Sequence, residues 1–152
     1  MESWNDYKKL FQSINIISIL DDIFKQSRVQ DEVIRLNQEQ LNSGVDSKDQ
    51  VINTIGGSPY RAYTVKIKKA KGQPTNIVTL RDTGKFQDSF RVKITNEGYE
   101  ITADFRKGED DIRDNLPGQF DVLGLTPESL AELVYETILP RLTKILREKL
   151  KI

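Results

Sequence analysis

The sequence contains no cysteine and no histidine, and these two absences exclude more chemistry than any other feature of its composition. Disulfides, thiol nucleophiles, zinc fingers, haem ligation and imidazole-based catalytic triads all need one of these side chains. An excess of either charge is also missing, because 23 Lys and Arg residues balance 23 Asp and Glu residues. Any attraction to nucleic acid or to an anionic membrane must therefore be local.

Long apolar runs are missing as well. The densest one, residues 14–20, is interrupted by Asn15 and Ser18 and is far shorter than the roughly 20 residues of a membrane span. The first six residues do not resemble a basic leader, so we expect no signal peptide. These absences predict a protein of a reducing cytoplasm that makes no membrane contact.

The rest of the composition fits one domain spanning residues 1–152, with 37% hydrophobic and 30% charged residues and only 9 Gly and 5 Pro. Apolar residues at spacings of three and four predict a helix over residues 5–24. They predict a second helix over residues 29–42, which ends at Gly44 and carries Gln40 on its apolar stripe. We treat residues 1–28 as an N-terminal helical extension of the domain.

The middle of the chain changes character twice. Residues 44–60 are rich in Gly, Ser, Asp and Asn, so we predict an exposed loop there and a candidate partner-binding segment. Thr64 is the expected N-cap of a short helix that runs to Lys71. Alternating apolar residues then predict an antiparallel hairpin over residues 90–94 and 99–105. A helical turn capped by Asp82 or Thr83 is expected before that hairpin.

The C-terminal segment is predicted to be one long helix, with Thr126 as N-cap, Pro127 at its first position and a bend near Pro140. Its predicted apolar stripe comprises Leu130, Val134, Ile138, Leu142, Ile145 and Leu150. The hairpin and this helix each present one apolar face, so we expect them to pack together. The predicted fold class is α+β, with N-terminal helices and a central antiparallel hairpin or sheet packed on a long, Pro-bent C-terminal helix.

Candidate catalytic and metal-binding patterns are incomplete. The Gly84-Lys85 pair suggests a phosphate-binding loop, but that pattern also needs Gly at position 79 and Ser or Thr at position 86, and both are missing. Residues 109–114 hold the densest group of carboxylates, without the spacing of a calcium loop. A divalent metal site and a solvated acidic loop both remain open there. We assign no catalytic residue, no metal ligand and no cofactor.

The charges are sorted along the chain although they balance overall. Residues 61–93 carry a net charge near +7, and residues 97–121 carry a net charge near −5. Two solvated surfaces, a head-to-tail contact between identical subunits, and a basic surface that faces passing DNA all fit this sorting. For the subunit contact, the candidate interface residues are Lys66, Lys68, Lys69, Lys71, Glu109, Asp110, Asp111 and Asp114.

Two segments carry a family resemblance. Residues 79–90, TLRDTGKFQDSF, resemble the L-x-x-T-G-x-L-x-x-S-[IF] signature of the virion-morphogenesis, or tail-completion, proteins of tailed bacteriophages. Residues 120–130, FDVLGLTPESL, resemble the F-L-G-L-S-x-x-D/E stretch that opens the C-terminal helix in that family. The resemblance covers about residues 30–150 and looks like the branch carried by Bacteroidetes phages and prophages, including crAss-like ones. The matching positions are Leu80, Asp82, Thr83, Gly84, Phe86, Ser89, Phe90, Leu123, Gly124, Leu125 and Thr126.

The resemblance implies a structural and non-enzymatic role for these positions and for the chain. It implies a virion component at the head–tail junction or the top of the tail, which is made in the host cytoplasm and assembles as an oligomeric ring or adaptor. The implied partners are further copies of the chain and other neck, tail and portal proteins of the phage. The alternative is a nucleic-acid-binding protein or a small accessory enzyme of a phage or mobile element, which would depend on the basic stretch or on the acidic cluster.

Overall fold

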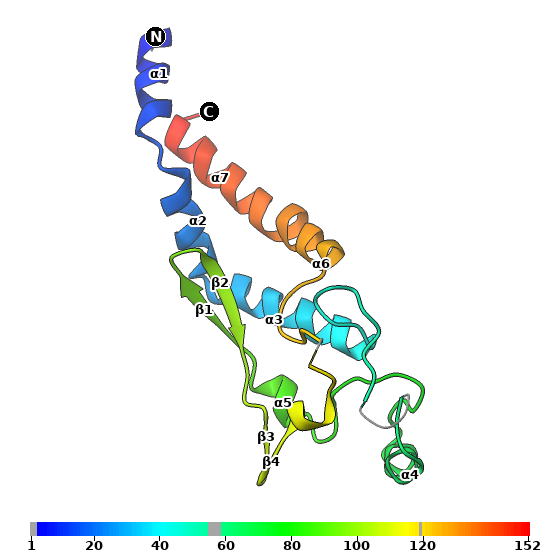
Figure 1. Ribbon diagram of the computed structural model, residues 1–152. Helices are drawn as coiled ribbons and strands as arrows, with labels where there is room; N and C mark the ends of the chain where they lie inside the picture. The colour runs from blue at the N-terminus through cyan, green and yellow to red at the C-terminus, as the bar shows by residue number, and fades with distance from the viewer. Residues whose placement is uncertain (1–2, 55–58, 119) are drawn as a thin grey trace.

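The computed structural model describes residues 3–54, 59–118 and 120–152. The fold is α+β and elongated, with both chain ends at one end of the molecule and α4, β3 and β4 at the other (Figure 1). In chain order the elements are α1 (Trp4–Ser13), α2 (Ile16–Phe24), α3 (Ser27–Asn42), α4 (Ala62–Ala70), α5 (Lys85–Asp88), β1 (Arg91–Thr95), β2 (Gly98–Thr102), β3 (Arg106–Lys107), β4 (Asp110–Asp111), the 3₁₀ turn η1 (Ile112–Asn115), α6 (Pro127–Glu132), the π-helical segment η2 (Leu133–Ile138) and α7 (Leu139–Leu150).

The single helix predicted over residues 5–24 is wrong, because the structure has two helices there. Ser3 and Asp6 form a capping box at the start of α1, in which each backbone amide donates to the other's side chain. Ile14 is extended, and the side-chain oxygen of Asn15 accepts a hydrogen bond of 3.1 Å from the amide of Ser18. An Asn in this position caps a new helix, so α2 begins in a new direction.

Helix α3 is the centre of the fold. It begins two residues before the predicted start and ends at Asn42 as predicted. Val29 and Val33 are fully buried on its apolar stripe, and the helix contacts α2, β1, α6 and η2. Gly44 follows with a left-handed φ of +80°, which confirms the expected stop signal.

The predicted hairpin is confirmed, but its predicted packing partner is wrong. Strand β1 pairs with β2 in an antiparallel register that places Val92 opposite Ile101. The hairpin contacts α3 most, and Tyr99 stacks on Phe24 of α2 with ring centroids 5.3 Å apart. Because α3 also contacts η2 and α6, it lies between the hairpin and the C-terminal helix (Figure 1). Helix α3 is apolar on two sides. The apolar faces of the hairpin and of the C-terminal helix, which we expected to pack together, each pack on α3 instead.

The exposed loop predicted over residues 44–60 is wrong for most of its described part. Only residues 48–51 are exposed there, whereas Asp46 and Ile52 are buried and Val45 pairs with Val51 in an isolated β-bridge. One Asp46 oxygen accepts the backbone amides of Lys48 and Gln50, each at 2.9 Å. The buried Asp46 carboxylate thus provides the hydrogen-bond acceptor that the backbone amides of this turn need, and this allows a polar loop to pack. Residues 55–58 of the predicted loop lie outside the described residues.

Two predicted helix caps are also wrong. Helix α4 begins at Ala62 with Arg61 in the N-cap position, so Thr64 lies inside it. Helix α5 forms the helical turn expected before the hairpin, but Gly84 is its N-cap, with a left-handed φ of +90° and no side-chain cap. The carboxylate of Asp82 binds lysines instead, as described below.

The C-terminal helix begins as predicted, since the hydroxyl of Thr126 accepts the amide of Ser129 at 3.2 Å and Pro127 occupies the first turn. The predicted apolar stripe is wrong at its start, because Leu130 and Val134 are 43% and 39% exposed. The buried row runs through Leu133, Thr137 and then Ile138. A π-helical turn contains more residues than an α-helical one, so η2 moves the buried row by one position just before Pro140.

Candidate interaction surfaces

The first family-like segment builds part of the core. Phe86 and Phe90 are 6% and 1% exposed, and their rings meet edge to face with centroids 5.1 Å apart. The Ser89 hydroxyl donates to the Phe86 carbonyl at 2.6 Å and accepts the Asp104 amide at 2.9 Å, so it joins α5 to the chain after β2. At Gly84 a Cβ would lie 3.3 Å from the Asp88 carboxylate. These residues shape the fold and leave no open site between them.

The other motif positions of this segment, Leu80, Asp82 and Thr83, also make contacts within the fold. Leu80 packs against the core with a left-handed φ of +51°, which is unusual for a residue with a side chain. The Thr83 hydroxyl accepts a weak hydrogen bond of 3.5 Å from the Lys85 amide. The carboxylate of Asp82 pairs with the ammonium groups of Lys71 and Lys107, the latter at 2.8 Å. Hydrogen bonds from these two ammonium groups lower the pKa of Asp82 to about 2.

The second family-like segment is held by side chains of α3. The Asn37 amide group donates to the Val122 carbonyl at 3.1 Å, and its oxygen accepts the Gly124 amide at 3.2 Å. The Gln40 amide group donates to the Gly124 carbonyl at 2.6 Å, and its oxygen accepts the Thr126 amide at 3.0 Å. Two side chains on α3 thus pair with residues 122–126 as a neighbouring strand would.

The loop before α4 holds the same segment from its other side. Asp46 accepts the Asp121 amide at 3.1 Å, and the Ser47 amide donates to the Asp121 carbonyl at 2.8 Å. A Cβ on Gly124 would lie 3.0 Å from the Cβ of Ser47, so only glycine allows this approach. Leu123 and Leu125 pack against the core on either side of it. The second segment therefore positions the C-terminal helix on α3.

Sequence analysis missed the buried amides that carry these contacts. Asn37 and Gln40 are 0% and 6% exposed, and Gln87 is 5% exposed with its amide group donating to the Thr79 carbonyl at 2.9 Å. One signal was present in the sequence, because Gln40 lies on the apolar stripe of α3. A polar side chain on a buried stripe needs a partner, and a carbonyl or amide of another segment is the usual one.

Of the four candidate interface lysines, two are exposed on α4 and two contact polar groups of their own chain. Lys66 and Lys69 are exposed on α4. Lys68 is buried, with its ammonium group 3.0 Å from the Arg81 carbonyl, 3.2 Å from the Gln73 side-chain oxygen and 4.8 Å from the Tyr60 ring centroid. The placement of Lys68 at a subunit surface is therefore wrong, and Lys71 binds Asp82 of its own chain.

The four candidate interface carboxylates lie on a small two-stranded ladder and the turn after it. Asp110 and Asp111 form β4, which pairs with β3, while Glu109 lies between the strands and Asp114 lies in η1. Hydrogen bonds from Arg113 lower the pKa of Asp111 to about 2, with the closest guanidinium contact at 2.5 Å. The acidic stretch is thus partly neutralised by its own arginine.

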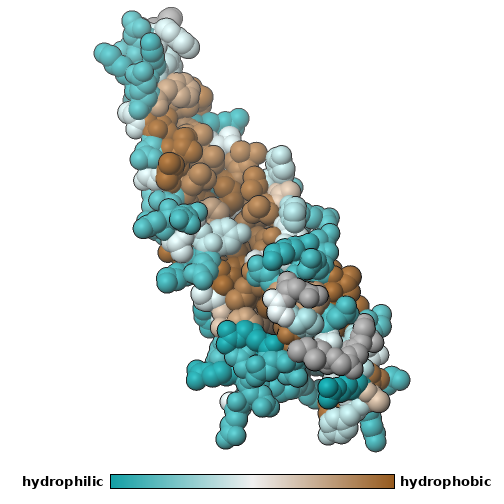
Figure 2. Space-filling model, in the orientation of Figure 1, coloured by the Kyte–Doolittle hydropathy of each residue, from teal (hydrophilic) through white to brown (hydrophobic). Residues whose placement is uncertain are grey.

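A second surface is apolar, and no part of the described chain covers it. Figure 2 shows apolar residues gathered over the region of α2 and α7. Helix α1 has no buried residue at all. The exposed large apolar residues of these helices and of α6 and η2 are Trp4, Phe11, Ile16, Ile17, Leu130, Val134, Tyr135 and Leu139. Large contiguous apolar areas on a soluble chain mark interaction sites.

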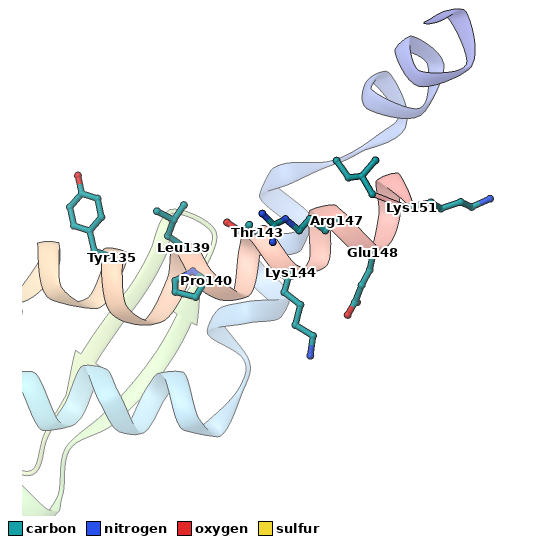
Figure 3. A pocket seen from close by; sticks show the side chains of 9 residues that line it. Tyr135, Leu139, Pro140, Thr143, Lys144, Arg147, Glu148 and Lys151 are labelled. Carbon is teal, nitrogen blue, oxygen red and sulfur yellow. The ribbon is translucent and has the colours of Figure 1, made fainter. Parts of the chain in front are cut away.

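An open groove of about 670 Å³ runs along the outer side of α7 (Figure 3). Tyr135, Leu139 and Pro140 line its apolar end, and Lys144, Arg147 and Lys151 line its basic end. Tyr135 and Leu139 project to the same side of the helix (Figure 3). The groove contains no pair of polar groups arranged for catalysis, but its apolar floor and charged edge suit a protein segment.

Neither a metal cluster nor a membrane-spanning helix occurs in the described parts of the chain. No three Asp or Glu side chains of residues 3–54, 59–118 and 120–152 converge as metal ligands. No helix of these residues is long and apolar enough to cross a bilayer. Comparisons with family models, with curated proteins and with solved structures find no match to this chain.

Proposed function

We propose that this protein is a non-enzymatic structural component of a phage particle, which assembles as a ring or adaptor at the head–tail junction or the top of the tail. Further copies of the chain and the neck, tail and portal proteins of the phage are its partners. The location and the partners follow from the resemblance of residues 79–90 and 120–130 to tail-completion proteins.

One observation about the molecule carries the binding role. Large apolar side chains are bare on α1, α2, α6, η2 and α7, whereas every buried polar side chain of the described residues has a hydrogen-bond partner. An enzyme site usually concentrates perturbed polar groups in a cavity, and an assembly protein presents apolar surface to a neighbour. The distribution in this chain supports the second role.

The first candidate partner for this apolar surface is a second copy of the chain. Helix α1 has only 10 residues, and helices shorter than about 12–15 residues are marginal in water without packing. Tyr7 and Leu10 are half buried, while Trp4 and Phe11 are 79% and 57% exposed. A neighbouring subunit would cover the bare half of α1 and gain an apolar contact on its own α7. Such a head-to-tail contact generates a ring when the rotation between neighbouring subunits closes, as the proposed role requires.

Sedimentation velocity across a range of concentrations tests this contact. The wild-type chain has a monomer mass of 17.5 kDa and should form larger species, whereas Phe11→Asp and Leu139→Asp should shift it to monomer. Val51→Asp is the matched control, because Val51 is 64% exposed but lies outside this surface. A wild-type chain that stays monomeric at every attainable concentration would contradict self-assembly.

Protein analysis of purified particles tests the location. The chain should be present in particles of the phage that encodes it, and gold labelling should place it at the neck or tail top. Its absence from particles with complete tails would contradict the virion role.

A further inference from the structure

Helix α4 and the loop after it form the most one-sided charged region of the molecule. Residues 61–81 contain six Lys or Arg residues and no Asp or Glu. Arg61, Lys66, Lys69, Lys71 and Arg81 are exposed. The helix lies at the opposite end of the molecule from α1 and the chain termini (Figure 1). This positive surface is therefore separate from the apolar one.

The buried lysine fixes which side of α4 faces outward. The Lys68 ammonium points into the protein, where it donates to the Arg81 carbonyl and lies over the Tyr60 ring. Successive helical residues are about 100° apart, so Tyr63 and Lys66 lie nearly opposite Lys68. Tyr63 is 76% exposed, in agreement with this geometry. The outward side of α4 thus presents one aromatic ring and ammonium groups in a set orientation.

The nearest acidic residue in the sequence cancels only part of this charge. Asp82 pairs with Lys71 of this region and also with Lys107 of β3, so two lysines share one carboxylate. Burial lowers the pKa of the Lys68 ammonium; the charge of Asp82 opposes that shift, and the charges of Lys71 and Lys107 add to it. Several cations therefore lie close together on this side of the protein.

The acidic stretch of a second copy is the weaker candidate for covering α4. Asp111 is paired with Arg113, and Asp104 is paired with Arg106. The two stretches also meet inside one chain, because Lys107 of β3 binds Asp82. A phosphate backbone, in contrast, is uniformly negative, and its bases offer flat faces to an exposed aromatic ring.

We propose that α4 is a nucleic-acid-binding helix, which contacts the phosphate backbone through Lys66 and Lys69 and stacks Tyr63 on a base. The contact does not select a sequence, because contacts to phosphates carry no direct sequence information. It is independent of the apolar assembly surface and stands if the ring proposal fails.

Fluorescence anisotropy with labelled duplex and single-stranded DNA of mixed sequence tests the proposal on the full chain. Two phosphate contacts predict that raising the salt from 50 to 200 mM weakens binding roughly 12-fold. The double variant Lys66→Glu, Lys69→Glu should weaken binding to both DNAs at least tenfold. Tyr63→Ala should weaken binding to the single strand about tenfold and to the duplex less.

The double variant Lys8→Glu, Lys9→Glu is the matched control, because it makes the same charge change on exposed residues of α1. Circular dichroism melting verifies that each variant is folded. Equal loss of DNA binding in both double variants would overturn the proposal, as would undetectable wild-type binding at low salt. It would also be overturned if the α4 variant lost self-association but kept its DNA affinity, since α4 would then face another subunit.

Discussion

The region around α3 buries its apolar residues inside the subunit, whereas helix α1 leaves its apolar residues uncovered. Val29, Val33 and Leu41 of α3 are 0% exposed, and its buried amides are hydrogen-bonded to residues 122–126. Helix α1 is amphipathic too, but it has no buried residue and is only 10 residues long. The same kind of sequence pattern therefore serves internal packing in one region and leaves an uncovered apolar surface, the proposed binding surface, in the other.

This difference separates stability from assembly in the molecule. The contacts of α3 with the hairpin and the C-terminal helix bury the core, so changes there should unfold the protein. Changes on α1 should leave the isolated subunit folded and act on its association. Matched substitutions in the two regions therefore test whether they differ in this way.

The largest expected effect comes from replacing Phe90, which is 1% exposed, with alanine. Phe90→Ala should lower the free energy of unfolding by about 3–5 kcal/mol because it leaves a cavity beside Phe86. Phe11→Ala is the control, since the same ring is 57% exposed there, and its effect should stay within about 0.5 kcal/mol. Urea denaturation of the isolated subunit measures both, and similar losses would mean that the two regions do not differ.

A smaller effect is expected from the buried amide of Asn37. Asn37→Ala leaves the Val122 carbonyl and the Gly124 amide without their partner, and each unsatisfied group costs about 1–3 kcal/mol. The neighbouring Gln38 makes one hydrogen bond, to the Gln87 carbonyl, and is only half buried. Gln38→Ala should therefore cost about 1 kcal/mol or less in the same urea experiment. Equal losses would argue against strand-like pairing by α3.

The smallest effect concerns pH and Asp82. Its pKa is about 2 in the folded chain, below the ordinary value of 3.8, so its ion pairs stabilise the fold at neutral pH and that contribution is lost as the pH falls from about 4 through 2. Because the carboxylate is 38% exposed, solvent screening limits the contribution to about 1 kcal/mol.

Asp82→Asn should therefore remove part of the stability loss between pH 4 and pH 2, as measured by thermal melting. Asp22→Asn is the control, because Asp22 is 72% exposed and pairs only with Lys25, at 3.6 Å. If the melting temperatures of Asp82→Asn and the wild type fall by the same amount between pH 4 and pH 2, the ion pairs of Asp82 with its two lysines contribute nothing to the stability of the fold.

Local signals in the sequence predicted several local elements correctly. The C-terminal end of α3, the hairpin, the helical turn of α5 and the Thr126 cap depend on spacing and on residues within one or two turns. The break before α2 was missed because apolar periodicity continues through Ile14, although Asn15 starts a new helix by accepting a hydrogen bond from the Ser18 amide.

Contacts between distant segments could not be predicted in the same way. Nothing local in Asn37 or Asp46 shows that their partners are residues 121–124. The charge pattern likewise did not separate Lys66 from Lys68, because two residues along a helix is enough to turn a side chain from solvent into the protein. The exposed apolar surface could be predicted only in part, since the two apolar sides of the C-terminal helix look like one stripe in the sequence.

The π-helical segment η2 also bears on how the chain length can vary. An α-helix in contact with a core normally tolerates neither insertion nor deletion, because one residue more or less rotates everything after it by about 100°. Segment η2 already contains one residue beyond the α-helical repeat, so deleting a residue within 133–138 should restore an ordinary helix while Leu133 and Leu142 keep their sides. A chain that is one residue shorter in this segment should therefore keep the packing of its C-terminal helix on α3.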